Sequence, residues 1–76
     1  MKQLTQAVFE GQCRSIKSAA TDKNGDTWFY QVSSNQLYTN EIEGGHEDNS
    51  VFAVTFVGSE FDTSDWKNSA MDREFN

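Results

Sequence analysis

Apolar and polar positions alternate along this chain in short runs separated by polar turn signals, a pattern typical of β-strands. The clearest example covers residues 16–32, where two strand-like runs flank Asn24-Gly25. Asn and Gly tolerate the positive φ angles of tight hairpin turns, and the aromatic run after the turn suits a half-buried pleated surface. This stretch predicts a β-hairpin.

Two registers are available to the hairpin. A two-residue Asn24-Gly25 loop would scatter the apolar residues over both faces, whereas a three-residue loop over 23–25, with Gly25 left-handed, gathers them on one face. We therefore predict the three-residue loop. It pairs Ile16 with Val32, Ser18 with Tyr30 and Ala20 with Trp28, and it places Asp22 opposite Asp26. Trp28 and Tyr30 then face the core, and Phe29 is left as the exposed aromatic.

The rest of the first half extends this antiparallel arrangement. Residues 4–10 fit a helix or a strand, and we favour a strand that ends in a bend at Gly11, before a further strand over 13–21. Residues 37–42 alternate well enough for a third antiparallel strand. The polar, glycine-containing stretch 43–49 is expected to be an exposed loop.

The most apolar run covers residues 51–57 and ends at Gly58. It predicts a central strand that is covered on both faces, with Phe52, Val54 and Phe56 in the core. The cover is expected from a short C-terminal helix, because Asp62 or Thr63 can cap its first turn. This helix would carry Trp66, Ala70 and Met71 and pack on the sheet through Trp66.

These elements predict one small domain over residues 1–76 of the mainly β (α+β) class. We expect a curled antiparallel sheet of four to five strands, barrel-like in its curvature, with a short C-terminal helix. Seventy-six residues leave room for one core. The two Trp, two Tyr and six Phe favour a folded core over disorder, because aromatic side chains bury large areas.

Charge is distributed unevenly. The net charge is −6, but residues 41–76 hold nine acids against two bases, a net of −7, whereas residues 1–40 have a net of +1. A phosphate backbone is bound through Lys and Arg, so this asymmetry argues against nucleic-acid binding and favours a basic partner. The lone Cys13 and the lack of a long apolar run indicate a reducing, cytoplasmic setting and no membrane partner.

Catalytic and metal-binding motifs are weak. Asp22, Asn24 and Asp26 match the first oxygen ligands of a calcium loop, but Thr27 and Ser33 stand where such a loop needs Gly and Glu. His46 and its acidic neighbours lack the ligand spacing of a zinc site. Cys13, expected to be buried or neutral, has no catalytic context. We expect no catalytic residues, no metal site and no cofactor, and therefore not an enzyme.

The remaining candidate for function is the acidic cluster of Glu41, Glu43, Glu47 and Asp48. Its ordinary interpretation is a solvated face that keeps a small protein soluble. Its sharper interpretation is a docking surface for a partner protein with a basic surface, such as a nucleic-acid enzyme. Glu41 and Glu43, two apart on a strand, would project on one face about 6.5–7 Å from each other. Phe29 completes this predicted partner-binding set.

Small size, acidity, aromatic content and the lack of a catalytic motif resemble, in composition alone, small phage and mobile-element proteins that inhibit nucleic-acid enzymes. We therefore expect a non-enzymatic binding protein, an inhibitor or modulator whose acidic face competes with DNA or RNA. The alternative is a small β-domain that binds single-stranded nucleic acid by stacking bases on Phe29 and Tyr38.

Overall fold

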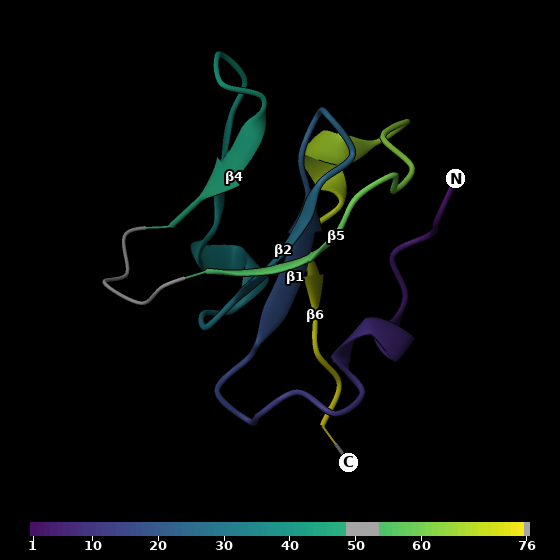
Figure 1. Ribbon diagram of the computed structural model, residues 1–76. Helices are drawn as coiled ribbons and strands as arrows, with labels where there is room; N and C mark the ends of the chain where they lie inside the picture. The colour runs from purple at the N-terminus through teal and green to yellow at the C-terminus, as the bar shows by residue number, and fades with distance from the viewer. Residues whose placement is uncertain (49–53, 76) are drawn as a thin grey trace.

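The computed structural model describes residues 1–48 and 54–75, and the chain is mainly β (Figure 1). A four-stranded antiparallel sheet has the order β5-β2-β1-β6, and a smaller two-stranded sheet consists of β3 and β4. The strands are β1 (Ser18–Thr21), β2 (Thr27–Tyr30), β3 (Tyr38–Asn40), β4 (Gly45–Glu47), β5 (Thr55–Gly58) and β6 (Met71–Asp72). Three single turns of 3-10 helix accompany them, η1 (Gln6–Phe9), η2 (Ser34–Gln36) and η3 (Trp66–Asn68).

The central hairpin of β1 and β2 has the predicted register. Ser18 pairs with Tyr30 and Ala20 with Trp28. The Gly25 N–H donates to the Asp22 carbonyl at 3.0 Å, and Gly25 has a φ of 94°. These features are those of a type I turn followed by a left-handed glycine, so the three-residue loop is confirmed.

Both faces of this hairpin are covered, which overturns the prediction for Phe29. Its side chain is 3% exposed and packs with Phe9, Ile16 and Ala19, with 5.8 Å between the ring centroids of Phe9 and Phe29. Successive side chains of a strand point to opposite faces, and η1 supplies Phe9 to the face on which Phe29 lies. The strand predicted over 4–10 is also wrong, because residues Gln6–Phe9 form the turn η1.

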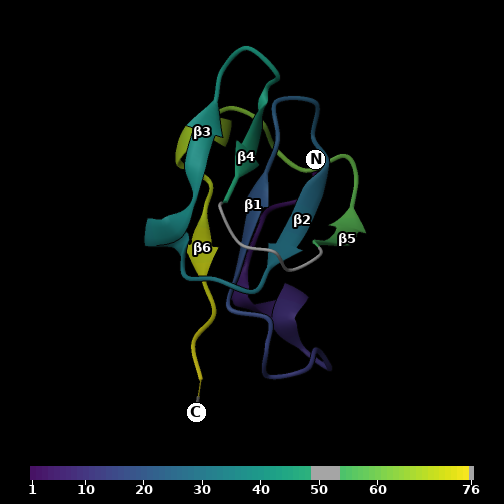
Figure 2. The ribbon, with the colours of Figure 1, turned by 90° about the vertical axis from the view of Figure 1, so that its left-hand side faces the viewer.

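The opposite face of the hairpin meets β3 and β4, which Figure 2 shows on the near side of β1. The Tyr30 hydroxyl donates to the His46 carbonyl at 3.2 Å. The Lys23 N–H donates to the Gly44 carbonyl at 2.8 Å, which joins the two hairpin turns. Tyr30 is buried, as predicted, between the sheet and this second hairpin.

The second hairpin replaces the loop that the sequence predicted over 43–49. Residues 45–47 form β4, and His46 is 8% exposed; Asn49 lies outside the described residues. The strand predicted over 37–42 is shortened to β3, because the chain turns at 41–44 and Gly44 adopts a φ of 73°. The polar composition of β4 reflects its position, since it is attached by backbone pairing with β3 and by hydrogen bonds of His46 with Asp22, Tyr30 and Trp66.

The apolar run after this hairpin is not a central strand. Its described part, β5, is at the end of the four-stranded sheet and pairs with β2. Val54 is 45% and Phe56 49% exposed, so the prediction that they lie in the core is wrong; Phe52 lies outside the described residues. A strand at a sheet edge has one neighbour, and here Phe56 contacts the Trp28 ring edge-on at 4.9 Å.

The predicted C-terminal helix is also absent from the described residues. The chain makes the single turn η3 and then becomes the strand β6, which pairs Met71 with Ala19. Ser69 ends the turn because its hydroxyl accepts from the Thr21 N–H at 2.9 Å and so fixes the chain against β1. Since β5 and β6 are its two edges, the sheet is not closed into a barrel.

Residues 12–17 form a loop where the sequence predicted the start of a strand. The Arg73 guanidinium donates to the carbonyls of Gln12, Cys13 and Ile16 and thereby holds this loop. Cys13 is exposed, not buried, and a hydrogen bond with Ser15 lowers the pKa of its thiol.

In the described residues, no helix has the length and apolar character needed to cross a membrane.

Candidate functional site

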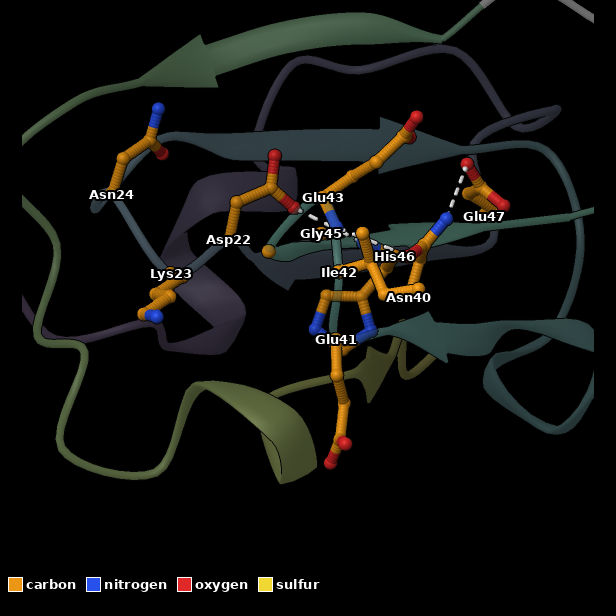
Figure 3. A pocket seen from close by; sticks show the side chains of 11 residues that line it. Asp22, Lys23, Asn24, Asn40, Glu41, Ile42, Glu43, Gly45, His46 and Glu47 are labelled. Carbon is orange, nitrogen blue, oxygen red and sulfur yellow. Dashed lines mark hydrogen bonds between the residues drawn. The ribbon is translucent and has the colours of Figure 1, made fainter.

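The four acidic residues of the predicted site do not form one ordered row. Glu41 lies in the turn between β3 and β4, and its carboxylate forms an ion pair with the Lys67 ammonium at 2.6 Å, which lowers the pKa of Glu41. Figure 3 shows Glu41 pointing away from Glu43 and Asp22. The predicted strand pair of Glu41 and Glu43 is therefore wrong, since both residues lie in a turn.

A first hollow lies beside this turn, and we call it the turn pocket (Figure 3). It is lined by Asp22, Lys23, Asn24, Asn40, Glu41, Ile42, Glu43, Gly44, Gly45, His46 and Glu47. Glu47 is held in place by Asn40, whose side-chain amide donates to it at 3.4 Å. The pocket thus gathers Glu43 and Glu47 with a carboxylate from the other hairpin, Asp22.

Asp22 occupies the junction of the two hairpins. Its carboxylate accepts a hydrogen bond from the His46 N–H at 3.3 Å. A side chain at Gly45 would bring its Cβ to 3.3 Å from the same carboxylate oxygen, so glycine permits this close approach. Burial raises the pKa of Asp22 above its ordinary value, although the contact with His46 opposes the shift. None of the Lys and Arg side chains in the described residues forms an ion pair with it.

A second hollow, the aromatic groove, adjoins the first and encloses about 620 Å³. It is lined by Asp22, Trp28, Tyr30, Tyr38, His46, Glu47, Asp48 and Val54. Trp28 and Tyr30 are two apart on β2 and so share one face, and Tyr38 stands opposite Glu47 across β3 and β4. The groove is therefore built where one face of the central sheet meets the second hairpin.

The electrostatic field in the aromatic groove is negative. Burial, together with the charges of Asp22, Asp48 and Glu47, raises the pKa of Tyr30. Partial desolvation and the Glu47 carboxylate raise the pKa of Tyr38. A nearby negative charge disfavours a phenolate and favours a cation. The groove thus combines aromatic walls with a field that attracts positive charge.

Asp22, His46 and Ser69 are the residue types of a nucleophilic triad, but their contacts are structural. The His46 Nε2 lies 2.8 Å from the Trp66 carbonyl, which accepts, so Nε2 carries the proton and cannot take one from Ser69. The Ser69 hydroxyl itself donates toward carbonyl oxygens, among them that of Trp66 at 2.7 Å. Asp22 meets the His46 backbone and not its ring. This cluster fastens η3 and β4 to β1.

The described residues include no group of three His, Cys, Asp or Glu side chains that could hold a metal ion. Phe29 lies in the core and lines neither hollow. Of the predicted partner-binding set, Glu41, Glu43 and Glu47 line the turn pocket, Glu47 and Asp48 line the aromatic groove, and Phe29 lies in the core. Glu41 points away from Glu43 and is paired with Lys67.

Sequence reasoning missed Asp22, Trp28 and Tyr30 as lining residues. The signal was present in the hairpin register. Asp22 follows Ser18 and Ala20 at two-residue spacing, and these two residues pair with Tyr30 and Trp28, so the Asp22 side chain points to the same face. What that face meets, however, depends on β4, which the sequence did not reveal. Comparisons of the chain with protein-family models, curated proteins and solved structures found no match, so the arrangement of these residues is the basis for a functional proposal.

Proposed function

We propose that this chain is a non-enzymatic binding protein that docks the acidic surface around its two hollows on a basic surface of a partner protein, as an inhibitor or modulator. The observation that supports the proposal is the convergence of carboxylates from both hairpins. Asp22 from the central hairpin and Glu47 from the second hairpin line both hollows, Glu43 lines one and Asp48 the other.

Few cations neutralise this surface. Lys67 is engaged by Glu41, and Lys23 extends beside Gly44 at the rim of the turn pocket. The described lining of the aromatic groove includes three acids and neither Lys nor Arg. A surface with this excess of negative charge speeds encounter with a basic patch and repels phosphate groups. Proteins that bind DNA or RNA carry such basic patches. This protein would compete with the nucleic acid for the basic patch of its partner.

Binding of single-stranded nucleic acid has less support. Of the two aromatic residues that this alternative requires, Phe29 is buried in the core. Tyr38 is 47% exposed, but it stands beside Glu47 in a negative field. A base stacked on Tyr38 would bring its phosphate toward these carboxylates, which opposes binding.

Fluorescence anisotropy separates these functions. A labelled deca-lysine peptide represents a basic surface, and a labelled single-stranded oligonucleotide of equal length represents nucleic acid. We expect the peptide to bind at low salt, with an association rate that falls as salt screens exposed charges, and the oligonucleotide not to bind. Binding of the oligonucleotide alone would contradict the proposal.

A matched pair of variants tests where the peptide binds. Glu41→Gln, Glu43→Gln, Glu47→Gln and Asp48→Asn together remove four charges from the proposed surface. Glu10→Gln, Glu60→Gln, Asp65→Asn and Glu74→Gln remove four charges from residues that line neither hollow. We expect the first variant to slow association at least tenfold more than the second. Equal slowing would show that net charge, and not this surface, attracts the peptide.

A further inference from the structure

The aromatic groove presents a different chemistry from the rest of the acidic surface. Tyr38 and Glu47 are cross-strand neighbours in its lining, and the half-buried Trp28 lines it from β2. Tyr30 forms the deeper part, and its hydroxyl is already engaged by the His46 carbonyl. The groove therefore offers aromatic surface and carboxylates together, whereas the described lining of the turn pocket has carboxylates but no Trp, Tyr or Phe ring.

Cations differ in how well they suit such a site. An ammonium group is compact and strongly hydrated, and it has no plane that matches an aromatic face. A guanidinium is planar and weakly hydrated, stacks on aromatic rings, and donates two parallel hydrogen bonds to a carboxylate. Among the described residues that line the groove, a ring and a carboxylate lie side by side and meet both of these requirements.

We propose that the aromatic groove binds the guanidinium of one arginine side chain of the partner, stacked on Tyr38 and paired with the Glu47 carboxylate. This inference rests on the proposed function and names the side chain that anchors it. Asp22 adds a partly buried carboxylate that forms no ion pair in the described part of the chain. A guanidinium that enters the groove loses contacts with water. The carboxylates and the aromatic ring replace those contacts.

An NMR titration tests the groove apart from the partner. Nα-acetyl-arginine amide is added to the isotopically labelled full chain, with Nα-acetyl-lysine amide and tetramethylammonium in parallel titrations. We expect saturable shifts at the Trp28 indole and at the Tyr38 and Glu47 amides. Arginine should bind more tightly than either of the other cations. Weaker binding of arginine than of lysine or tetramethylammonium would overturn the assignment.

Two variants and two matched controls locate the probe. Tyr38→Ala and Glu47→Gln should each weaken arginine binding roughly three- to tenfold, as expected for the loss of one cation–aromatic or one charged contact. Phe75→Ala removes an aromatic ring of similar exposure outside the groove, and Glu10→Gln removes a distant carboxylate; both should leave binding unchanged. Equal effects of variants and controls, or no saturable shift at the groove, would overturn the inference.

The two proposals fail in different ways. If the deca-lysine peptide binds the acidic surface but the arginine probe does not enter the groove, the docking function stands and the arginine anchor is wrong. If the arginine probe binds while the basic peptide does not, the groove is a cation site, and docking on a basic surface is wrong.

Discussion

Replacing Phe29 and Phe56 separately by alanine tests which aromatic residues form the core. The two residues lie on neighbouring strands and have the same side chain, but Phe29 is 3% exposed and Phe56 is 49% exposed. The sequence pattern alone predicts the reverse assignment. The difference between the two losses of stability therefore measures burial and not residue type.

The expected magnitudes follow from the contacts of each ring. Phe29→Ala empties a site enclosed by Phe9, Ile16 and Ala19, and truncation of a buried Phe costs about 3–5 kcal/mol. Phe56→Ala removes a half-exposed ring and its edge-on contact with Trp28, which together contribute about 1–2 kcal/mol. A domain of 76 residues has a total stability of roughly 4–11 kcal/mol, so the first variant approaches the limit of folding.

Urea unfolding followed by far-UV circular dichroism and tryptophan fluorescence provides the measurement. We expect the unfolding midpoint of Phe29→Ala to fall at least twice as far as that of Phe56→Ala. Phe29→Leu, which keeps most of the volume, should cost less than about 1.5 kcal/mol and gives a folded reference if the alanine variant does not fold. Equal shifts for the two alanine variants, or a larger shift for Phe56→Ala, would refute the assignment of the core.

Three further substitutions test local features of the fold. Gly25→Ala should cost about 1–2 kcal/mol and lower the thermal midpoint, because Gly25 has a φ of 94° and an added Cβ would lie 3.3 Å from the Phe61 carbonyl. Thr21→Val should cost about 1–3 kcal/mol in urea unfolding, since it leaves the buried Thr27 hydroxyl without its 2.8 Å partner; adding Thr27→Val should recover part of the loss. Burial raises the pKa of Asp22 in the folded chain, so the parent should lose stability as pH rises from the ordinary Asp pKa through the raised one. Asp22→Asn keeps an acceptor for the His46 N–H and should be more stable than the parent at neutral pH. Urea unfolding at several pH values should show this pH dependence in the parent and not in Asp22→Asn. An unchanged midpoint for Gly25→Ala, no recovery in the double Thr variant, or equal pH dependence of the parent and Asp22→Asn would contradict the respective prediction.

Local signals in the sequence predicted the central hairpin correctly. The turn at Asn24-Gly25 depends on conformations that few other residues tolerate, and the alternation of the flanking strands then determines the register. What covers each face could not be read in the same way. Phe29 alternates correctly with Trp28 and Tyr30, but its burial depends on Phe9, which is twenty residues away and reaches it from a 3-10 turn.

Polar strands and apolar edges account for the other differences. β4 contains Gly, His and Glu, a composition that predicts a loop. It becomes a strand because β3, the Asp22 carboxylate and the Tyr30 hydroxyl satisfy its backbone. The run after it is strongly apolar, yet its described part lies at the edge of the sheet. The candidate site depends on both features. Glu41, Glu43, Glu47 and Asp48 were predicted from the uneven charge, whereas Asp22, Trp28 and Tyr30 were not, because their place in the lining depends on β4.

The central position of the β1–β2 hairpin also determines how the chain can fold. The two strands are joined by a short turn, so they can pair within microseconds, before any distant segment arrives. β6 must then find β1 across 54 residues, from Ser18 to Asp72, and the entropy of closing that loop makes this pairing late. Because β6 pairs through only two residues, we expect local opening of the native state to be easier there than in the β1–β2 hairpin. We therefore expect the hairpin that supports both hollows to stay closed longer than the C-terminal edge of the sheet.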